Sequence, residues 1–326
     1  MARFIIKRLL WMIPTLLGVL FIIFTINYFT PGDPAQLSLG SDYTEEAYQT
    51  ARENMGLDKP FLVRYALYVK GIVTKFDLGT SYDTKRPVKD MIAGRIGRTL
   101  ALGAMSSLVT IIFGVSIGIL SAVKQYSPVD YLATALAVIF SAAPGFWVGL
   151  MAIILFSLKL HWLPAAGLGT WKHYVLPVIC MGLSPMSIVV RMTRTSMLDV
   201  IRQDYIRTAR AKGVAERTVI FRHALRNALI PVITIIGMQL TMMFGGSFII
   251  ESIFSIPGMG MLMLTSINNL DYPTTQGIVF LLSTCVCVIN LLVDLAYAMV
   301  DPRMKSQFAG SGKTKKTKAP AKKEAV

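Results

Sequence analysis

The chain has 326 residues, of which 54% are hydrophobic and only 16% are charged, and its formal net charge is +15. This composition is far more apolar than that of a soluble protein of similar length, so an integral membrane protein is expected. The positive charge alone would also fit nucleic-acid binding. However, no basic patch is interleaved with stacking aromatic side chains, and no nucleic-acid partner is expected.

Six apolar segments are each long enough to cross a bilayer, which takes about 20 residues of helix. They cover residues 9–29, 99–123, 131–158, 175–190, 231–250 and 276–300. The first follows basic residues, as a secretory signal does, but its length and the lack of a small-x-small cleavage site predict a retained N-terminal anchor over residues 1–29. The fourth is the shortest, and we expect part of the following polar helix to complete its crossing.

Glycine and proline residues inside two of these segments predict how the helices pack. Gly114 and Gly118 in the second segment have the small-xxx-small spacing that permits close helix approach in lipid. Pro144 and Gly145 in the third segment predict a kink.

The Lys and Arg residues divide unequally between the two sides of the membrane. Of the 33, 21 fall on the side that holds both termini and the stretch between the fourth and fifth segments, and 12 fall on the other side. An excess of positive charge marks the cytoplasmic side. Both termini and a polar loop over residues 199–229 are therefore predicted to lie in the cytoplasm.

The loop over residues 30–98 is expected to be an external subdomain between the first and second transmembrane helices. Its sequence predicts a turn at "TPGDPA", a short polar helix closed by Gly56, and an amphipathic helix over residues 59–73. The subdomain either only orders the loop or receives a partner, and the sequence leaves both open. Residues 99–305 form the predicted core domain, and the basic, low-complexity tail over residues 306–326 is predicted to be disordered.

Few residues could form a catalytic, metal-binding or ion-coupling site. The three histidines and three cysteines show no zinc or disulfide spacing, and no catalytic motif occurs, so we expect no enzymatic activity, metal site or cofactor. Asp294 lies inside the sixth segment, with Asn290 one turn earlier on the same side of the helix. A carboxylate in a span is either an interhelical hydrogen-bond partner or an ion-coupling group, and we favour the first.

The most informative stretch is "DYIRTARAKGVAERTVIFRHALRNALIP", residues 204–231. A first amphipathic helix is predicted from Asp199 to Lys212, and Gly213 suits a left-handed helix stop with Val214 in apolar contact after it. A second helix is predicted from residue 215 or 216, and Pro231 is expected to begin the next span. The apolar side of the second helix holds Val219, Ile220, Ala224, Leu225 and Ala228. A lipid-binding interfacial helix would explain the arginines but not the glycine break.

This stretch resembles the EAA loop of binding-protein-dependent ABC importer permeases, which docks into the ATPase. The match is to the dipeptide and oligopeptide branch, since "DYIRTARAKG", "RHALRNALIPV", "ESIFSIPGMG", "DYPTTQG" and "NLLVD" before "DPR" all resemble it, as do "PGDPA", "GLDKP" and "DLGTS". Against the general EAA pattern the chain keeps Ala209, Gly213 and Leu225. It has Arg207 in place of Glu, Thr208 in place of the first Ala, His223 in place of Ile and Arg226 in place of Pro. These replacements are usual in the peptide branch.

The resemblance implies an all-α, six-helix permease of the type I ABC importer class in a prokaryotic inner membrane. Its implied partners are a second, homologous permease subunit, two cytoplasmic ABC ATPases and an external solute-binding protein. The residues implied to couple to the ATPase are Ala209, Arg210, Ala211, Gly213, Val214, Arg217 and Leu225. The candidate pathway or interhelical polar residues are Gly237, Gln239, Gly245, Asn290 and Asp294.

The expected function is import of peptides that the solute-binding protein delivers, with ATP hydrolysed by the separate ATPases. Nickel, glutathione or metal-chelator import by a member of the same branch remains open. An ion-coupled carrier is the rival from another class, because it would explain the spans and Asp294. It would not require the glycine-broken loop.

Overall fold

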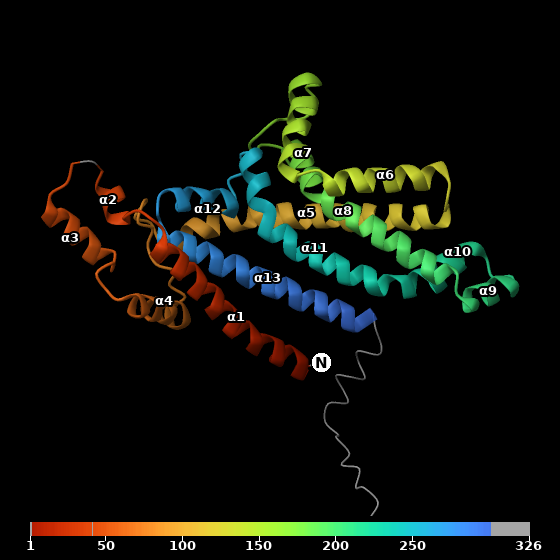
Figure 1. Ribbon diagram of the computed structural model, residues 1–326, viewed down its shortest axis with the longest axis horizontal. Coiled ribbons are helices and arrows are strands. Elements are labelled where there is room, and N and C mark those ends of the chain that lie inside the picture. Colours follow the sequence, from red (N-terminus) through yellow and green to blue (C-terminus); the bar gives the residue numbers. More distant parts are fainter. Residues whose placement is uncertain (1, 41, 301–326) are drawn as a thin grey trace, which may run out of the picture.

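The computed structural model describes residues 2–40 and 42–300, which form an elongated bundle of helices (Figure 1). The external part holds α2 (Pro34–Leu39), α3 (Glu45–Asn54) and α4 (Phe61–Lys75). The long helices are α1 (Ala2–Phe29), α5 (Val88–Val123), α8 (Lys172–Ile201), α11 (Leu225–Ile253) and α13 (Tyr272–Val300). The shorter ones are α6 (Pro128–Ala142), α7 (Gly145–Ala152), α9 (Asp204–Ala211), α10 (Glu216–Thr218) and α12 (Met259–Asn268), with π-helical segments η1 (Ile153–Lys159) and η2 (Val219–Ala224).

Five helices of the described chain are long and apolar enough to cross a membrane, and a sixth span results if one bent helix pair is counted. The first, second, fourth, fifth and sixth predicted spans are thus confirmed as helices. The fourth runs through Ile201, so the polar residues after the apolar stretch do complete it. The predicted tail, residues 306–326, lies outside the described residues.

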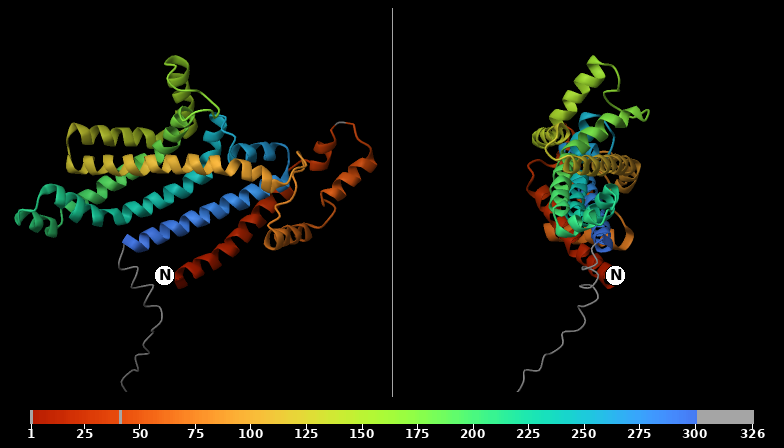
Figure 2. Two further views of the ribbon diagram at one scale, coloured as in Figure 1. Left: turned by 180° about the vertical axis from the view of Figure 1, so that it is seen from behind. Right: turned by 90° about the vertical axis from the view of Figure 1, so that its right-hand side faces the viewer.

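The third predicted span is broken at Pro144 and Gly145, where the sequence predicts a kink. α6 and the helix over residues 145–159 meet at 106°, so the expected kink is a sharp break. Ala143 and Pro144 are both extended there, because the residue before a proline is driven away from the helical region. Figure 2 shows α7 standing out from the bundle in both views.

Two helix boundaries also differ from the prediction. α5 begins at Val88 rather than near residue 99, because Val88 and Ile92 are buried in an apolar cluster with Leu78 and Ile278 at the outer end of the bundle. Residues 88–98 therefore belong to a long helix and not to an irregular loop. Pro231 does not begin a span either, since α10, η2 and α11 follow one another without a break from residue 216 to residue 253.

The predicted close approach of the second segment is confirmed, and its partner is α8. A Cβ atom on Gly114 would lie 2.9 Å from the Val189 side chain, and one on Gly118 would lie 2.5 Å from Thr193 Cβ. Neither glycine leaves room for a side chain.

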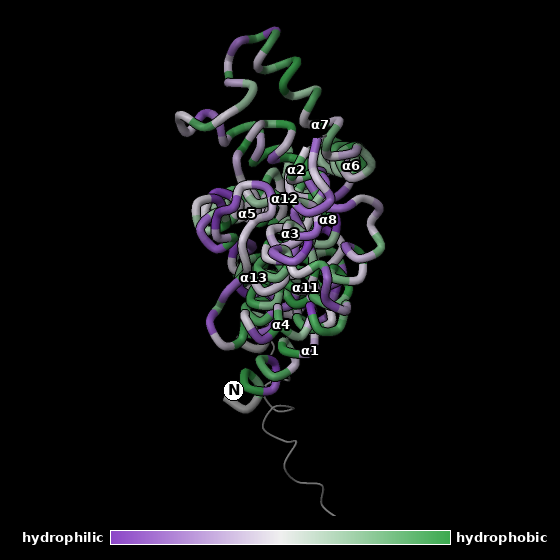
Figure 3. The backbone as a smooth tube through the Cα atoms, turned by 90° about the vertical axis from the view of Figure 1, so that its left-hand side faces the viewer, coloured by the Kyte–Doolittle hydropathy of each residue, from purple (hydrophilic) through white to green (hydrophobic). Residues whose placement is uncertain are grey.

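The two ends of the bundle carry different structures. α2 to α4 lie at one end of the long axis, and α9 and α10 lie at the other (Figure 1). Figure 3 looks onto the end formed by α2 to α4, where hydrophilic colouring is prominent around α3. The start of α1 and the end of α13 both point away from that end.

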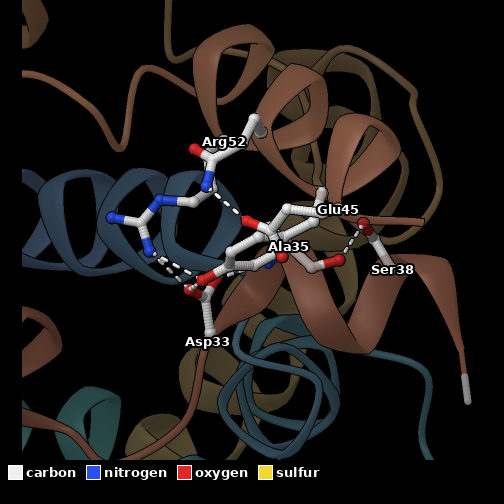
Figure 4. A network of polar contacts seen from close by, with 7 residues as sticks. Asp33, Ala35, Ser38, Glu45 and Arg52 are labelled. Atoms are coloured by element: carbon white, nitrogen blue, oxygen red, sulfur yellow. Dashed lines mark hydrogen bonds and ion pairs between the residues drawn. The ribbon is translucent and has the colours of Figure 1, made fainter. Parts of the chain in front are cut away.

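Asp33 organises the first part of the external region (Figure 4). Its side chain accepts hydrogen bonds from the Ala35 backbone N–H at 2.9 Å, from the Tyr48 hydroxyl at 2.7 Å and from Arg52 at 2.8 Å. One carboxylate thus caps the start of α2 and pairs with two side chains of α3, which explains the acidic residue in "PGDPA".

Candidate functional site

The candidate site is the elbow formed by residues 204–225, where α9 and the start of the α10–η2–α11 helix meet. α9 begins at Asp204 and not near Asp199, because α8 ends at Ile201 and Gln203 adopts an extended conformation. This break lets α9 fold back so that Ile206 is fully buried. The prediction of one continuous first helix from Asp199 was therefore wrong at its start.

The left-handed stop at Gly213 is confirmed. Gly213 has φ +76°, and the Val214 N–H donates to the Ala209 carbonyl at 3.2 Å, which is the long backbone bond of a Schellman motif. Nothing lies within 4 Å of a Cβ atom placed on Gly213, so only the backbone conformation demands glycine here. Val214 packs into the apolar cluster beneath the elbow, as expected.

An ion pair braces the elbow across the glycine. Arg210 Nη2 lies 2.6 Å from Glu216 Oε1, and Arg210 Nε donates to Glu216 Oε2 at 3.0 Å. This bidentate contact raises the pKa of the Arg210 guanidinium above its usual value. Sequence reasoning had assigned Arg210 only to a contact with the ATPase and had missed its intramolecular partner six residues on, a spacing that no helix rule picks out.

The elbow has two limbs, α9 and the helix that begins at residue 216. The second limb is anchored by the apolar side that the sequence predicted. Val219, Ile220, Ala224 and Ala228 are buried, together with Ile206 of α9, in a cluster that includes Met197 of α8 and Ala122 of α5. Leu225 is half-buried at its edge. A hydrogen bond of 2.9 Å from Asn227 Nδ2 to Tyr205 Oη joins the two limbs, and the sequence gave no signal for it.

The elbow presents a mixed surface away from this cluster. Ala211, Gly213 and Arg217 are exposed, while Ala209 is half-buried. Two exposed aromatic side chains that sequence reasoning missed, Tyr205 and Phe221, lie on the same segment. Small residues beside aromatic and basic ones form a surface that a partner protein can contact closely.

A buried ion pair ties the base of the elbow to the bundle. Arg194 of α8 binds Asp130 of α6 in a bidentate contact, with Nε–Oδ1 at 2.6 Å and Nη2–Oδ2 at 2.8 Å. Ser121 of α5 donates to the same carboxylate at 2.5 Å. Three helices therefore meet at one carboxylate near the elbow, and the contact holds α5, α6 and α8 together there.

The candidate pathway residues do not form one cluster. Gly237 is buried and leaves no room for a Cβ atom beside Val293 of α13. Asn290 accepts a 2.7 Å hydrogen bond from Thr241 of α11, and Asp294 pairs with Arg8 of α1 at 2.8 Å. These contacts fit the interhelical alternative for Gly237, Asn290 and Asp294.

Two other candidates form no such contact among the described residues. Gly245 is exposed, with nothing within 4 Å of a Cβ atom placed on it, and Gln239 is half-buried. Their assignment to a pathway stays a prediction. Within residues 2–40 and 42–300, no three His, Cys, Asp or Glu side chains gather as metal ligands would.

Comparison with known families decides the class of protein. Residues 114–306 match the model of the binding-protein-dependent transport system inner membrane component, and residues 1–103 match the model of its N-terminal part. The chain belongs to this family. The elbow, the long helix that follows it and the external helices all lie within the matched regions.

Curated relatives match over almost the whole chain. The dipeptide transport system permease protein DppB of Alkalihalophilus pseudofirmus is 40% identical over 94% of this chain and 100% of its own length. The glutathione transport system permease protein GsiC of Pectobacterium atrosepticum is 42% identical over 94% of this chain and 99% of its own length. A solved structure of the MetNI methionine ABC transporter, in inward-facing conformations, shares the fold with a TM-score of 0.56 at 17% identity, covering 65% of this chain and 96% of that one.

Proposed function

We propose that this chain is one of two permease subunits of an ATP-driven importer and that, with the second subunit, it forms the path for peptides handed over by an external solute-binding protein. The single observation that carries the proposal is the elbow at Gly213, braced by Arg210 and Glu216 and placed at the start of a helix that continues across the bundle. Relatives 40–42% identical that are named dipeptide and glutathione permeases support the peptide class of substrate.

The geometry suits transmission of force from the cytoplasmic side. The helix from residue 216 to residue 253 has 38 residues. At 1.5 Å per residue it is about 57 Å long, enough to cross the bilayer from end to end. A displacement of the elbow by an ATPase subunit would therefore move α11 as one rod and tilt the spans between inward-open and outward-open arrangements.

The topology that this mechanism needs has both termini and the elbow in the cytoplasm and α2 to α4 outside. The split of 21 to 12 basic residues supports it, as does the position of α9 and α10 at the opposite end from α2 to α4 (Figure 1). A cell-membrane location, two ATPase subunits and a second permease are part of the same proposal.

Glutathione is the second candidate substrate, because the GsiC relative is as similar to this chain as the DppB relative. Both substrates are small peptides, so the permease fold alone does not choose between them. The ion-coupled carrier is disfavoured, since Asp294 is already paired with Arg8.

The test is purification of the tagged full chain from its own cells. Two ATPase subunits and a second permease should accompany it, and a solute-binding protein should stimulate ATP hydrolysis by the complex. The binding protein is then screened for thermal shifts with a dipeptide, a longer peptide, glutathione and nickel, since a specific ligand stabilises by mass action. A chain that purifies alone and transports a solute without ATP would overturn the proposal.

A further inference from the structure

A cavity of about 190 Å³ lies at the foot of the external helices, between α1, α4 and α13. Phe24 of α1, Leu67 and Tyr68 of α4 and Gln276 of α13 form parts of its wall. The cavity lies at the opposite end of the helix bundle from the elbow. The proposed function gives it no role.

The cavity is positively charged. Lys59 and Arg64 line it, and no Asp or Glu is among its lining residues. Neither cation forms an ion pair within the part of the chain that the structure describes. The nearby carboxylates of Asp77 and Asp271 already accept hydrogen bonds from neighbouring backbone N–H groups. An anion would therefore be attracted to the cavity without an acidic competitor in its wall.

Two tyrosines form part of the cavity wall. Tyr68 Oη is buried and has no hydrogen-bond partner among the described residues, and burial raises the pKa of Tyr68, so the hydroxyl stays a donor. Burial also raises the pKa of Tyr82 to about 12, and its hydroxyl donates to the Met55 carbonyl at 3.0 Å while the Arg64 guanidinium interacts with it. Tyr82 thereby holds Arg64 at the cavity, while Tyr68 closes part of the wall with its hydroxyl buried behind it.

The cavity lies near the ends of two helices that are apolar and long enough to cross a membrane. Phe24 is five residues before the end of α1, and Gln276 is four residues after the start of α13. At 1.5 Å per residue these positions are about 6–8 Å inside the helix ends. In the proposed topology these ends face the outer membrane surface, where the headgroup layer is about 5–7 Å thick, so a lipid headgroup would reach the cavity.

An exposed apolar surface borders the cavity. Leu67 lines it and is still 50% exposed, and Leu62 and Val63 on the same helix are exposed as well. The Tyr65 hydroxyl donates to the Leu17 carbonyl at 2.9 Å, which fixes α4 against α1. A basic pocket beside exposed apolar side chains is the arrangement that a lipid with a charged head and hydrocarbon tails requires.

We propose, on the topology of the proposed function, that this cavity binds the phosphate of an anionic phospholipid of the outer leaflet through Lys59 and Arg64, with the acyl chains along Val63 and Leu67. The bound lipid would hold α4 on the membrane part of the chain. Free phosphate has the same head chemistry but no tails, and the experiment separates the two.

The test is native mass spectrometry of the purified full chain titrated with phosphatidylglycerol, with phosphatidylcholine of the same acyl chains as reference. The wild type should retain phosphatidylglycerol preferentially. Arg64→Gln and Lys59→Gln should each reduce retention roughly fivefold, the effect expected per basic residue near an anionic headgroup. Lys70→Gln is the matched control, because Lys70 is an exposed residue of α4 outside the cavity wall. Arg64→Lys should restore most of the retention by keeping the charge.

Three outcomes would overturn the proposal. The first is equal retention of the two lipids by the wild type. The second is an equal loss in Lys70→Gln and Arg64→Gln, which would indicate a diffuse surface effect. The third is inorganic phosphate displacing phosphatidylglycerol at equal concentration, which would indicate a free-anion site. Thermal melting in detergent shows whether each variant is folded, and Lys59→Gln, at an exposed position, keeps the proposal testable should Arg64→Gln fail to fold.

Discussion

Thr99 and Glu251 are joined by a 2.6 Å hydrogen bond from Thr99 Oγ1 to Glu251 Oε1, inside the bundle where the Glu251 side chain is completely buried. The other carboxylate oxygen accepts the Gly260 N–H at 2.7 Å, and Thr99 Oγ1 in turn accepts the Met259 N–H. One carboxylate at the end of α11 therefore caps the start of α12 and binds α5. This accounts for the glutamate of "ESIFSIPGMG" and links α12 to the helix that begins at the elbow.

The first prediction concerns this network. Thr99→Val keeps the shape but removes the donor to Glu251 and the acceptor for Met259, and leaving buried polar groups unpaired costs about 1–3 kcal/mol. We expect a clearly lower melting temperature of the detergent-solubilised chain. Ser252→Ala is the control, because the Ser252 hydroxyl, among the described residues, bonds only to the Phe248 carbonyl of its own helix. Equal melting temperatures for Thr99→Val and wild type would contradict the assigned network.

The second prediction concerns the glycines around the same carboxylate. A Cβ atom on Gly258 would lie 2.6 Å from Glu251 Oε1, closer than real contacts allow. Gly258→Ala should therefore displace Glu251 and detach α12, with protease cleavage between α11 and α12 as the measured sign. Gly94→Ala has open space around the new methyl group and should leave the cleavage pattern unchanged.

The contrast between these contacts and the elbow shows what the sequence can predict. The stop at Gly213 and the apolar side of the second limb follow from local rules, because a left-handed helix end needs glycine and a helix repeats every 3.6 residues. The Arg210–Glu216 and Arg194–Asp130 pairs depend on how separate helices meet, and no spacing rule finds them. The same holds for the 106° break, since Pro144 predicts a kink but tertiary packing sets its angle. α5 extends to Val88 because its first turns are buried by the outer cluster, which a hydropathy pattern does not contain.

The third prediction concerns Asp294. Asp294→Asn keeps the size of the side chain and a hydrogen-bond acceptor for Arg8, and the partly exposed pair is worth about 0.2–1 kcal/mol. Uptake by the complex should stay largely intact. Arg8→Gln is the matched change on the other helix and should behave alike. Abolished uptake in Asp294→Asn, with normal assembly and normal uptake in Arg8→Gln, would support ion coupling instead.

The fourth prediction concerns topology. In a variant that lacks the three native cysteines, Thr50→Cys on α3 and Thr208→Cys on α9 offer two exposed positions at opposite ends of the chain. A membrane-impermeant thiol reagent applied to intact cells should label the first and not the second. Labelling of Thr208→Cys before the cells are opened would place the elbow outside and remove the ATPase from the proposed function.

The last prediction tests whether the elbow transmits force. Gly213→Val would force a β-branched residue to φ +76°, at a cost of about 1–3 kcal/mol, or let α9 run on and re-aim the second limb. This cost is comparable to the free energies that couple distant sites in a protein. We therefore expect ATP hydrolysis to continue without driving uptake, while the chain remains in the membrane.

Two control variants separate the effect of the elbow's geometry from a general loss of stability and from a loss of charge. Gly167→Val places the same residue at φ +89° with open space around it, far from the elbow, and should lower stability without uncoupling. Arg222→Gln removes an exposed charge of the elbow without changing its backbone and should be mild. Binding-protein-stimulated ATPase activity and uptake are measured in parallel in reconstituted complex. If Gly213→Val kept both activities while Arg222→Gln lost both, the charge of this stretch and not its geometry would matter, and the elbow would be a lipid-binding helix.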